Sequence, residues 1–221
     1  MEETVIKIPD PQLGNTAFRF FAKLVSYVFH PLFIPTYIFG VLMLSFPSTF
    51  TVAMPFQLTL KLFSVFWMTA FFPAFAVFLL WKLKLNSSIY LRTQKERIAP
   101  YMITMFFYWW MYYLGRNMKD QPEVLEFFFF GIFLATIVGL IANNFFKISM
   151  HSMGVGGALA AVILFSFFYH TNLGLIITLA ALIAGMVCTA RLLLNTHSSF
   201  EIYAGLITGA ACQLLAYWWV G

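Results

Sequence analysis

The chain alternates long apolar segments with short polar ones, and the length of the apolar segments is the first guide to its fold. A bilayer core is about 30 Å thick and a helix rises about 1.5 Å per residue, so about 20 apolar residues can span it. Seven segments approach this length, at residues 17–46, 57–81, 100–114, 123–143, 154–169, 173–194 and 200–219. The pattern predicts an all-α, polytopic membrane helix bundle with about six to seven transmembrane helices.

The first segment differs from the others in its length and its prolines. Pro31 and Pro35 should break or kink it, because proline cannot continue the backbone hydrogen bonds of a helix. Its first half contains Arg19 and Lys23, so we expect that half to lie at the membrane interface. Residues 1–16 form a polar N-terminal tail in this interpretation, and residues 17–221 form a single transmembrane domain.

The composition indicates that a bilayer, rather than water, surrounds most of the chain. Hydrophobic residues make up 62% of the sequence and charged residues 10%, whereas soluble proteins average about 45–50% and about 25%. A water-soluble domain of this composition would expose too much apolar surface, and intrinsic disorder is excluded by the same count. Cys188 and Cys212 lie in apolar segments and are expected to be buried thiols rather than a disulfide.

The net charge of +5 narrows the choice of partners. The Lys and Arg residues are scattered between apolar segments, so we expect membrane lipids as partners and no nucleic acid. The chain is interpreted as an integral protein of a bacterial inner membrane. The distribution of cations mildly favours a cytoplasmic N-terminus, but cations kept for phosphate binding would bias that count. Sidedness and oligomeric state therefore stay open.

Counting spans from the N-terminus places three connections on the membrane face that holds the N-terminus. These connections are residues 82–99, 143–153 and 195–199. In or beside them lie Arg92, Lys95, Arg97, Lys147, Ser149, His151, Arg191, His197 and Glu201. Ionisable groups at membrane depth are costly unless they pair or function. We therefore expect one polar site at this face.

The third connection offers the most specific constellation. His197 and Glu201 are four residues apart, so on a helix the carboxylate can accept the Nδ1 proton and leave Nε2 free to attack. Arg191 ends the preceding span and can offer a two-pronged guanidinium to a phosphate. The alternative is an interfacial arginine beside a His–Glu pair that only caps a helix.

The other two connections are less specific when taken alone. Ser149 and His151 precede a glycine-rich helix start, where backbone N–H groups could hold an anion. Glycines also let membrane helices approach closely, which is the simplest interpretation of Gly205 and Gly209. Residues 92–100 alone look like an ordinary positive loop beside a membrane span.

Together, the three connections resemble the phosphatidic-acid-phosphatase type 2 superfamily, which includes lipid phosphatases and vanadium haloperoxidases. Its motifs are K-x6-R-P, P-S-G-H and S-R-x5-H-x3-D. The third motif is matched in spacing by Ala190-Arg191-x5-His197-x3-Glu201, and the second by Ile148-Ser149-Met150-His151. For the first motif, Arg97 precedes Ile-Ala-Pro100, and Arg92 is the cation nearest the required upstream spacing. The resemblance extends from about residue 82 to the C-terminus.

The resemblance implies a phosphatidic-acid-phosphatase-like helical core and a metal-independent hydrolase without a cofactor. The substrate would be a lipid phosphomonoester or an isoprenyl pyrophosphate. His197 would attack phosphorus to form a phosphohistidine, Glu201 would orient it, and His151 would protonate the leaving oxygen and then activate water. The phosphate would be held by Arg191, Arg97, Lys95, Arg92 and Ser149.

Two other functions remain possible from the sequence. A lipid phosphotransferase would use the same histidines and carboxylate with a lipid alcohol as acceptor. A non-catalytic protein that binds anionic lipids would retain the cations of a decayed site. His30 and His170 are interpreted as structural, because neither has a charged partner at a motif spacing.

Overall fold

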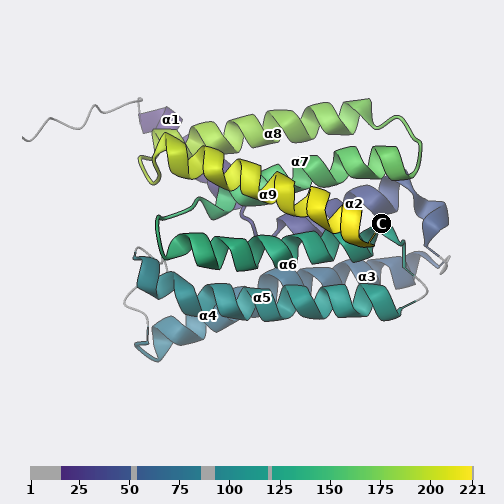
Figure 1. The fold of residues 1–221 in the computed structure, drawn as a ribbon, viewed down its shortest axis with the longest axis horizontal. Coiled ribbons are helices and arrows are strands. Elements are labelled where there is room, and N and C mark those ends of the chain that lie inside the picture. The colour runs from purple at the N-terminus through teal and green to yellow at the C-terminus, as the bar shows by residue number, and fades with distance from the viewer. Residues whose placement is uncertain (1–15, 51–53, 86–92, 119–120, 221) are drawn as a thin grey trace, which may run out of the picture.

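The computed structural model describes residues 16–50, 54–85, 93–118 and 121–220, and this part of the chain is helical without any strand. Figure 1 shows the helices packed side by side along one long axis. The elements are α1 (Thr16–Val28), α2 (Ile34–Ser45), the 3₁₀ turn η1 (Pro47–Thr49), α3 (Pro55–Phe66), the π-helical turn η2 (Trp67–Phe71), α4 (Phe72–Lys82), α5 (Gln94–Asn117), α6 (Val124–Asn143), α7 (Met150–Phe168), α8 (Gly174–Leu193) and α9 (Ser199–Val220).

Five helical segments of the described chain are long and apolar enough to cross a membrane. They are Phe56–Lys82, which joins α3, η2 and α4 into one span, and α6, α7, α8 and α9. The predicted break in the first segment is confirmed, because α1 ends at Val28 and α2 begins at Ile34 with Pro35 in its first turn. The resulting α2 is a shorter apolar helix of 12 residues.

Two predicted helix starts were placed too late along the chain. Helix α5 begins at Gln94 rather than at residue 100, because Thr93 and Glu96 form a capping box that starts the helix earlier. Helix α7 begins at Met150 rather than at residue 154, because the Ser149 side chain caps it. Lys95, Arg97 and His151 therefore lie in first helical turns and not in loops.

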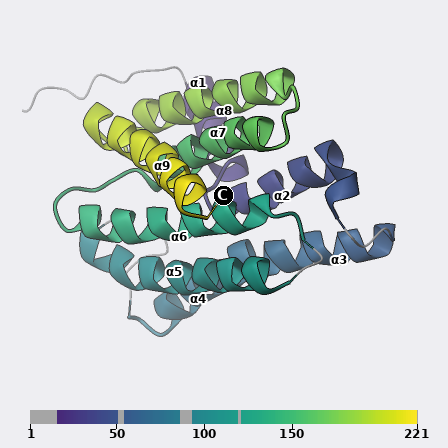
Figure 2. The ribbon, with the colours of Figure 1, turned by 45° about the vertical axis from the view of Figure 1, so that its right-hand side comes forward.

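Helices α7 and α9 pack closely against each other near their N-terminal ends. A Cβ on Gly209 would collide with the carbonyl oxygen of Met153, and one on Gly156 would collide with that of Leu206. Only glycine allows backbones to approach so closely, which confirms the packing interpretation of the glycines in α9. In Figure 2, α6 lies between the α7–α9 pair and α5. The polar residues at the starts of α5, α7 and α9 therefore belong to one helix bundle.

Two helix connections and the first turn of α5 lie at one end of the bundle. In Figure 1, the end of α4, the start of α5, the α6–α7 connection and the α8–α9 connection are all on the left, and the C-terminus lies on the right. We call the left-hand end the site end, defined by the connections 144–149 and 194–198 and the first turn of α5.

The two cysteines are both free: Cys212 is buried and Cys188 is half-buried.

Candidate functional site

His197 and Glu201 form a hydrogen-bonded pair at the start of α9. The Nδ1 atom of His197 lies 3.1 Å from Oε2 of Glu201 and 3.0 Å from the carbonyl oxygen of Lys147. Both partners are acceptors, so the hydrogen bonds assign the ring proton to Nδ1 and leave Nε2 unprotonated. The imidazole is therefore held as a neutral base with one free nitrogen.

Glu201 also caps the helix that carries it. The backbone N–H of Ser198 donates to the same Oε2 at 3.0 Å, and Ser198 Oγ accepts from the N–H of Glu201 at 3.3 Å. These two bonds make a capping box. The sequence left open whether the pair caps a helix or orients an imidazole, and this one carboxylate makes the hydrogen bonds of both arrangements.

The surroundings of His197 keep its ring neutral. The histidine is 9% exposed. Burial, followed by the charges of Arg191 and Arg97, lowers the pKa of His197 to about 4, although Glu201 acts in the opposite direction. The Nε2 lone pair is therefore available at neutral pH.

Three cations from three different elements surround this pair. Arg97 in the first turn of α5 is 8% exposed, and its Nη1 donates to the carbonyl oxygen of Ile148 at 3.2 Å. Burial and the charge of Arg97 lower the pKa of Lys147, on which Glu201 and Arg191 also act. The α6–α7 connection, α5 and α8 thus bring three positive charges to one place. Among the described residues, Glu201 is the carboxylate that raises the pKa of Lys147.

Arg191, in the last turn of α8, has unused hydrogen-bonding capacity. Its Nη1 donates to Ser26 Oγ at 3.5 Å, which is a long hydrogen bond. Its Nε atom is buried and has no hydrogen-bond partner among the described residues. A buried N–H group without a partner is costly, so this guanidinium is suited to an anionic acceptor.

His151 lies in the first turn of α7 and contacts the last turn of α1. Its Nε2 is 3.1 Å from the carbonyl oxygen of Ser26, the residue whose hydroxyl contacts Arg191. A carbonyl can only accept, so the proton is on Nε2 of His151 and Nδ1 is free in the neutral ring. Ser26 thus links the second histidine to Arg191.

Ser149 is fully buried and acts as the N-cap of α7. Its Oγ accepts from Ser152 N at 3.4 Å and from Ser152 Oγ at 3.0 Å. The backbone N–H of Ser149 donates to the carbonyl oxygen of Glu201 at 3.2 Å. This last bond joins the starts of α7 and α9 directly, and so fixes the two histidine-bearing turns relative to each other.

The remaining predicted phosphate-binding residues are Lys95 and Arg92. Lys95 is exposed on the first turn of α5. Arg92 lies outside the described residues. Arg97 is therefore the cation that α5 contributes to the described site.

Two residues that the structure places here had no predicted role in the site. Lys147 was grouped with the N-terminal face but was given no role. His30 was interpreted as structural, yet its ring lies 5.1 Å from that of His151, between ring centroids. Nothing in the local sequence of His30 signals this contact, because it forms only when the turn before α2 packs against α7.

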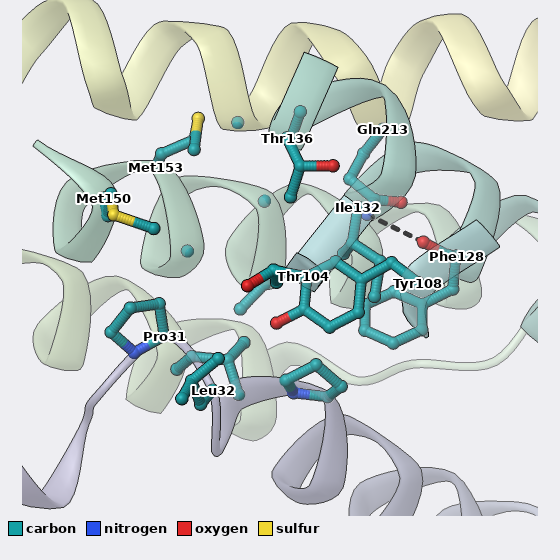
Figure 3. A pocket seen from close by; sticks show the side chains of 17 residues that line it. Pro31, Leu32, Thr104, Tyr108, Phe128, Ile132, Thr136, Met150, Met153 and Gln213 are labelled. Carbon is teal, nitrogen blue, oxygen red and sulfur yellow. Dashed lines mark hydrogen bonds between the residues drawn. The ribbon is translucent and has the colours of Figure 1, made fainter. Parts of the chain in front are cut away.

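An apolar cavity of about 50 Å³ lies among the helices of the bundle (Figure 3). Pro31 and Met150, which line it, are the chain neighbours of His30 and His151. The hydroxyls of Thr104 and Tyr108 point into it, and Gln213 at its far side donates to the carbonyl oxygen of Phe128 at 3.2 Å. Its walls come from the turn before α2 and from α2, α5, α6, α7 and α9.

The arrangement combines a neutral imidazole with a free Nε2, a second imidazole, and cations with hydrogen-bonding capacity. Among the described residues, no group of three or more His, Cys, Asp or Glu side chains is placed to hold a metal ion. The site can therefore accept a phosphate-like anion and offer it a nitrogen nucleophile.

Comparisons of this chain with protein-family models, with curated proteins and with solved structures found no match.

Proposed function

We propose that the protein is an integral membrane lipid phosphatase that hydrolyses a lipid phosphomonoester or an isoprenyl pyrophosphate through a phosphohistidine on His197. The observation that carries the proposal is a neutral His197, whose Nδ1 is bonded to Glu201, together with the Nε of Arg191, which has no hydrogen-bond partner among the described residues. The first supplies a nucleophile, and the second supplies a donor for a phosphate oxygen.

In the first step, Nε2 of His197 attacks phosphorus and the bond to the leaving oxygen breaks. Arg191, Arg97 and Lys147 stabilise the charge on the equatorial oxygens. Nδ1 of His151 takes up the proton of the monoprotonated phosphate as it binds and passes it to the leaving oxygen, while Nε2 stays on the carbonyl oxygen of Ser26. The negative charge of the bound phosphate stabilises this protonated imidazole among the cations.

In the second step, Nδ1 of His151 takes a proton from water, and the resulting hydroxide attacks phosphorus. The P–N bond breaks, phosphate leaves, and the lone pair returns to Nε2 of His197. His151 returns this proton to the departing phosphate and is neutral again. The net reaction consumes one water and releases one lipid alcohol, or one lipid monophosphate from a pyrophosphate, together with phosphate.

The apolar cavity that Pro31 and Met150 help to line supports a lipid as the substrate, because its walls suit a hydrocarbon group. The proposal includes a phosphatidic-acid-phosphatase-like core in which α2 and α5 cross the membrane with the five apolar spans. It also includes a bacterial inner membrane as the location.

The test is phosphate release from a panel of lipid phosphates by the full chain in detergent. Activity should survive EDTA and be blocked by vanadate, which can become five-coordinate on His197 and mimic the transition state. The variant His197→Ala should be inactive, and His170→Ala, at an exposed position at the other end of the bundle, should match the wild type. Complete loss of activity in EDTA that magnesium restores would contradict this mechanism.

A further inference from the structure

The turn between α1 and α2 places His30 against the second histidine of the site. The backbone N–H of Leu32 donates to Nδ1 of His30 at 3.4 Å, so the His30 proton is on Nε2. Pro31 packs on the first turns of α7: a Cβ added to Gly154 would lie 3.3 Å from Cβ of Pro31. The turn is therefore fixed both within itself and against the helix that carries His151.

The rings of His30 and His151 meet edge to face. Their centroids are 5.1 Å apart and their planes are inclined by 83°. This geometry is the preferred one for aromatic pairs and restricts rotation of either ring about its terminal torsion. The contact comes from a part of the chain that precedes the region carrying the three motifs.

His151 is thus held at two points by the same N-terminal segment. The carbonyl oxygen of Ser26 fixes its protonated nitrogen, Nε2, at 3.1 Å. One hydrogen bond leaves the ring free to swing about the axis of that bond. The ring of His30 removes this freedom and fixes the direction in which Nδ1 points.

We propose that His30 is a positioning residue that holds the His151 imidazole so that Nδ1 faces the leaving oxygen. This role rests on the proposed function, in which His151 is the general acid. A misplacement of about 1 Å at a reacting group can lower a rate about 10²-fold. Loss of the His30 ring should therefore lower lipid phosphate turnover by about 10²-fold, within the range of about 10²–10⁴-fold that general acid catalysis supplies.

Two substitutions separate the ring contact from the turn. His30→Asn keeps a side-chain acceptor for the N–H of Leu32 but removes the ring. His30→Phe keeps a ring against His151 but removes the acceptor. His170→Ala is the matched control, because His170 is exposed at the other end of the bundle. If the ring positions His151, His30→Phe should keep most of the wild-type turnover, and His30→Asn should lose it.

The leaving group separates positioning from general damage. An aryl phosphate has a good leaving group and needs little help from an acid, so His30→Asn should still phosphorylate His197 with it at about the wild-type rate. Equal losses of the lipid and aryl reactions would overturn the proposal. So would wild-type lipid turnover in His30→Asn, or a loss in His30→Phe as large as that in His30→Asn.

A spectroscopic measurement tests the same role without any substrate. The full chain, labelled with ¹⁵N-histidine in detergent, has four histidines to assign by substitution. In the wild type and in His30→Phe, His151 should show one protonated nitrogen, Nε2, and one unprotonated nitrogen. In His30→Asn the Ser26 bond should keep the proton on Nε2, but both ring signals should shift and broaden, because the ring loses the neighbour that fixes its direction. Unchanged His151 signals in His30→Asn would overturn the proposal, whereas an inactive wild type would refute only the lipid phosphatase function.

Discussion

Replacing Gly205 with alanine should disturb the site by forcing α7 and α9 apart. A Cβ at this position would lie 2.6 Å from the carbonyl oxygen of Ser149. Ordinary Cβ contacts begin at 3.4 Å, so the difference requires the two backbones to separate by about 0.8 Å. The carbonyl belongs to the main chain at the start of α7 and cannot turn aside as the end of a flexible side chain could.

The expected effects concern both stability and turnover. Overpacking of this kind costs about 1–3 kcal/mol, and a chain of this size loses about 2–4 °C of Tm per kcal/mol. The Tm of Gly205→Ala should therefore fall by roughly 2–12 °C. Because Ser149 N–H donates to the carbonyl oxygen of Glu201, the shift also reaches the residue that orients His197. Turnover of lipid phosphate should fall by about 10²-fold.

The assay compares Gly205→Ala with Gly185→Ala in detergent by thermal unfolding and by phosphate release. Gly185 lies within α8, and a Cβ there would meet nothing within 4 Å. This control should keep the wild-type Tm and activity. If Gly205→Ala behaves like Gly185→Ala in both measurements, the close approach of α7 and α9 does not position the site and the reasoning fails.

Further expectations concern the roles of single side chains. His151→Ala should cut lipid phosphate hydrolysis by about 10²–10⁴-fold but still form acid-sensitive phosphohistidine from an aryl phosphate; label that persists after His197→Ala is added would mean that the nucleophile is misassigned. Arg97→Ala should lower kcat/KM strongly, whereas exposed Lys95→Ala should not; equal kinetics for the two variants would count against the cation assignment. The pKa of His197 falls from 6.5 in the unfolded chain to about 4 in the folded protein, so the unfolded state binds more protons below pH 6.5. Its contribution to stability is then complete above pH 6.5 and is lost as pH falls toward 4, by about 2 kcal/mol between pH 7 and pH 5. In denaturation experiments, His197→Gln should lose less free energy of unfolding between pH 7 and pH 5 than the wild type. An equal loss would contradict the lowered pKa of His197.

The fold was largely predictable because span length and loop polarity are local properties. Five of the predicted spans coincide with helices that are long and apolar enough to cross a membrane. The spacing of His197 and Glu201 likewise predicted their contact, since residues four apart share a helix face. The start of α5 was misplaced although the capping signal of Thr93 and Glu96 was present in the sequence, because the charge of the segment favoured a loop.

The N-terminal part of the site could not be predicted in this way. The bond between His151 and Ser26 joins residues 125 positions apart. It depends on how the end of α1 lies against the start of α7, and no periodicity or motif in one sequence encodes that packing. Lys147 was missed for a related reason: its charge reaches the site because its carbonyl oxygen binds Nδ1 of His197, and a backbone contact of this kind has no sequence signal.

The shared carboxylate oxygen of Glu201 has a consequence for the energy of the proposed covalent cycle. Oε2 binds Nδ1 of His197 and the N–H of Ser198, and both bonds lie on the side of the imidazole away from Nε2. Formation and cleavage of a P–N bond at Nε2 would therefore leave every hydrogen bond of this connection intact. A frame that need not rearrange as charge moves through it contributes little reorganisation energy to the barrier. The capping box of α9 would thus hold His197 in one position while its Nε2 forms and then loses a bond to phosphorus in each turnover.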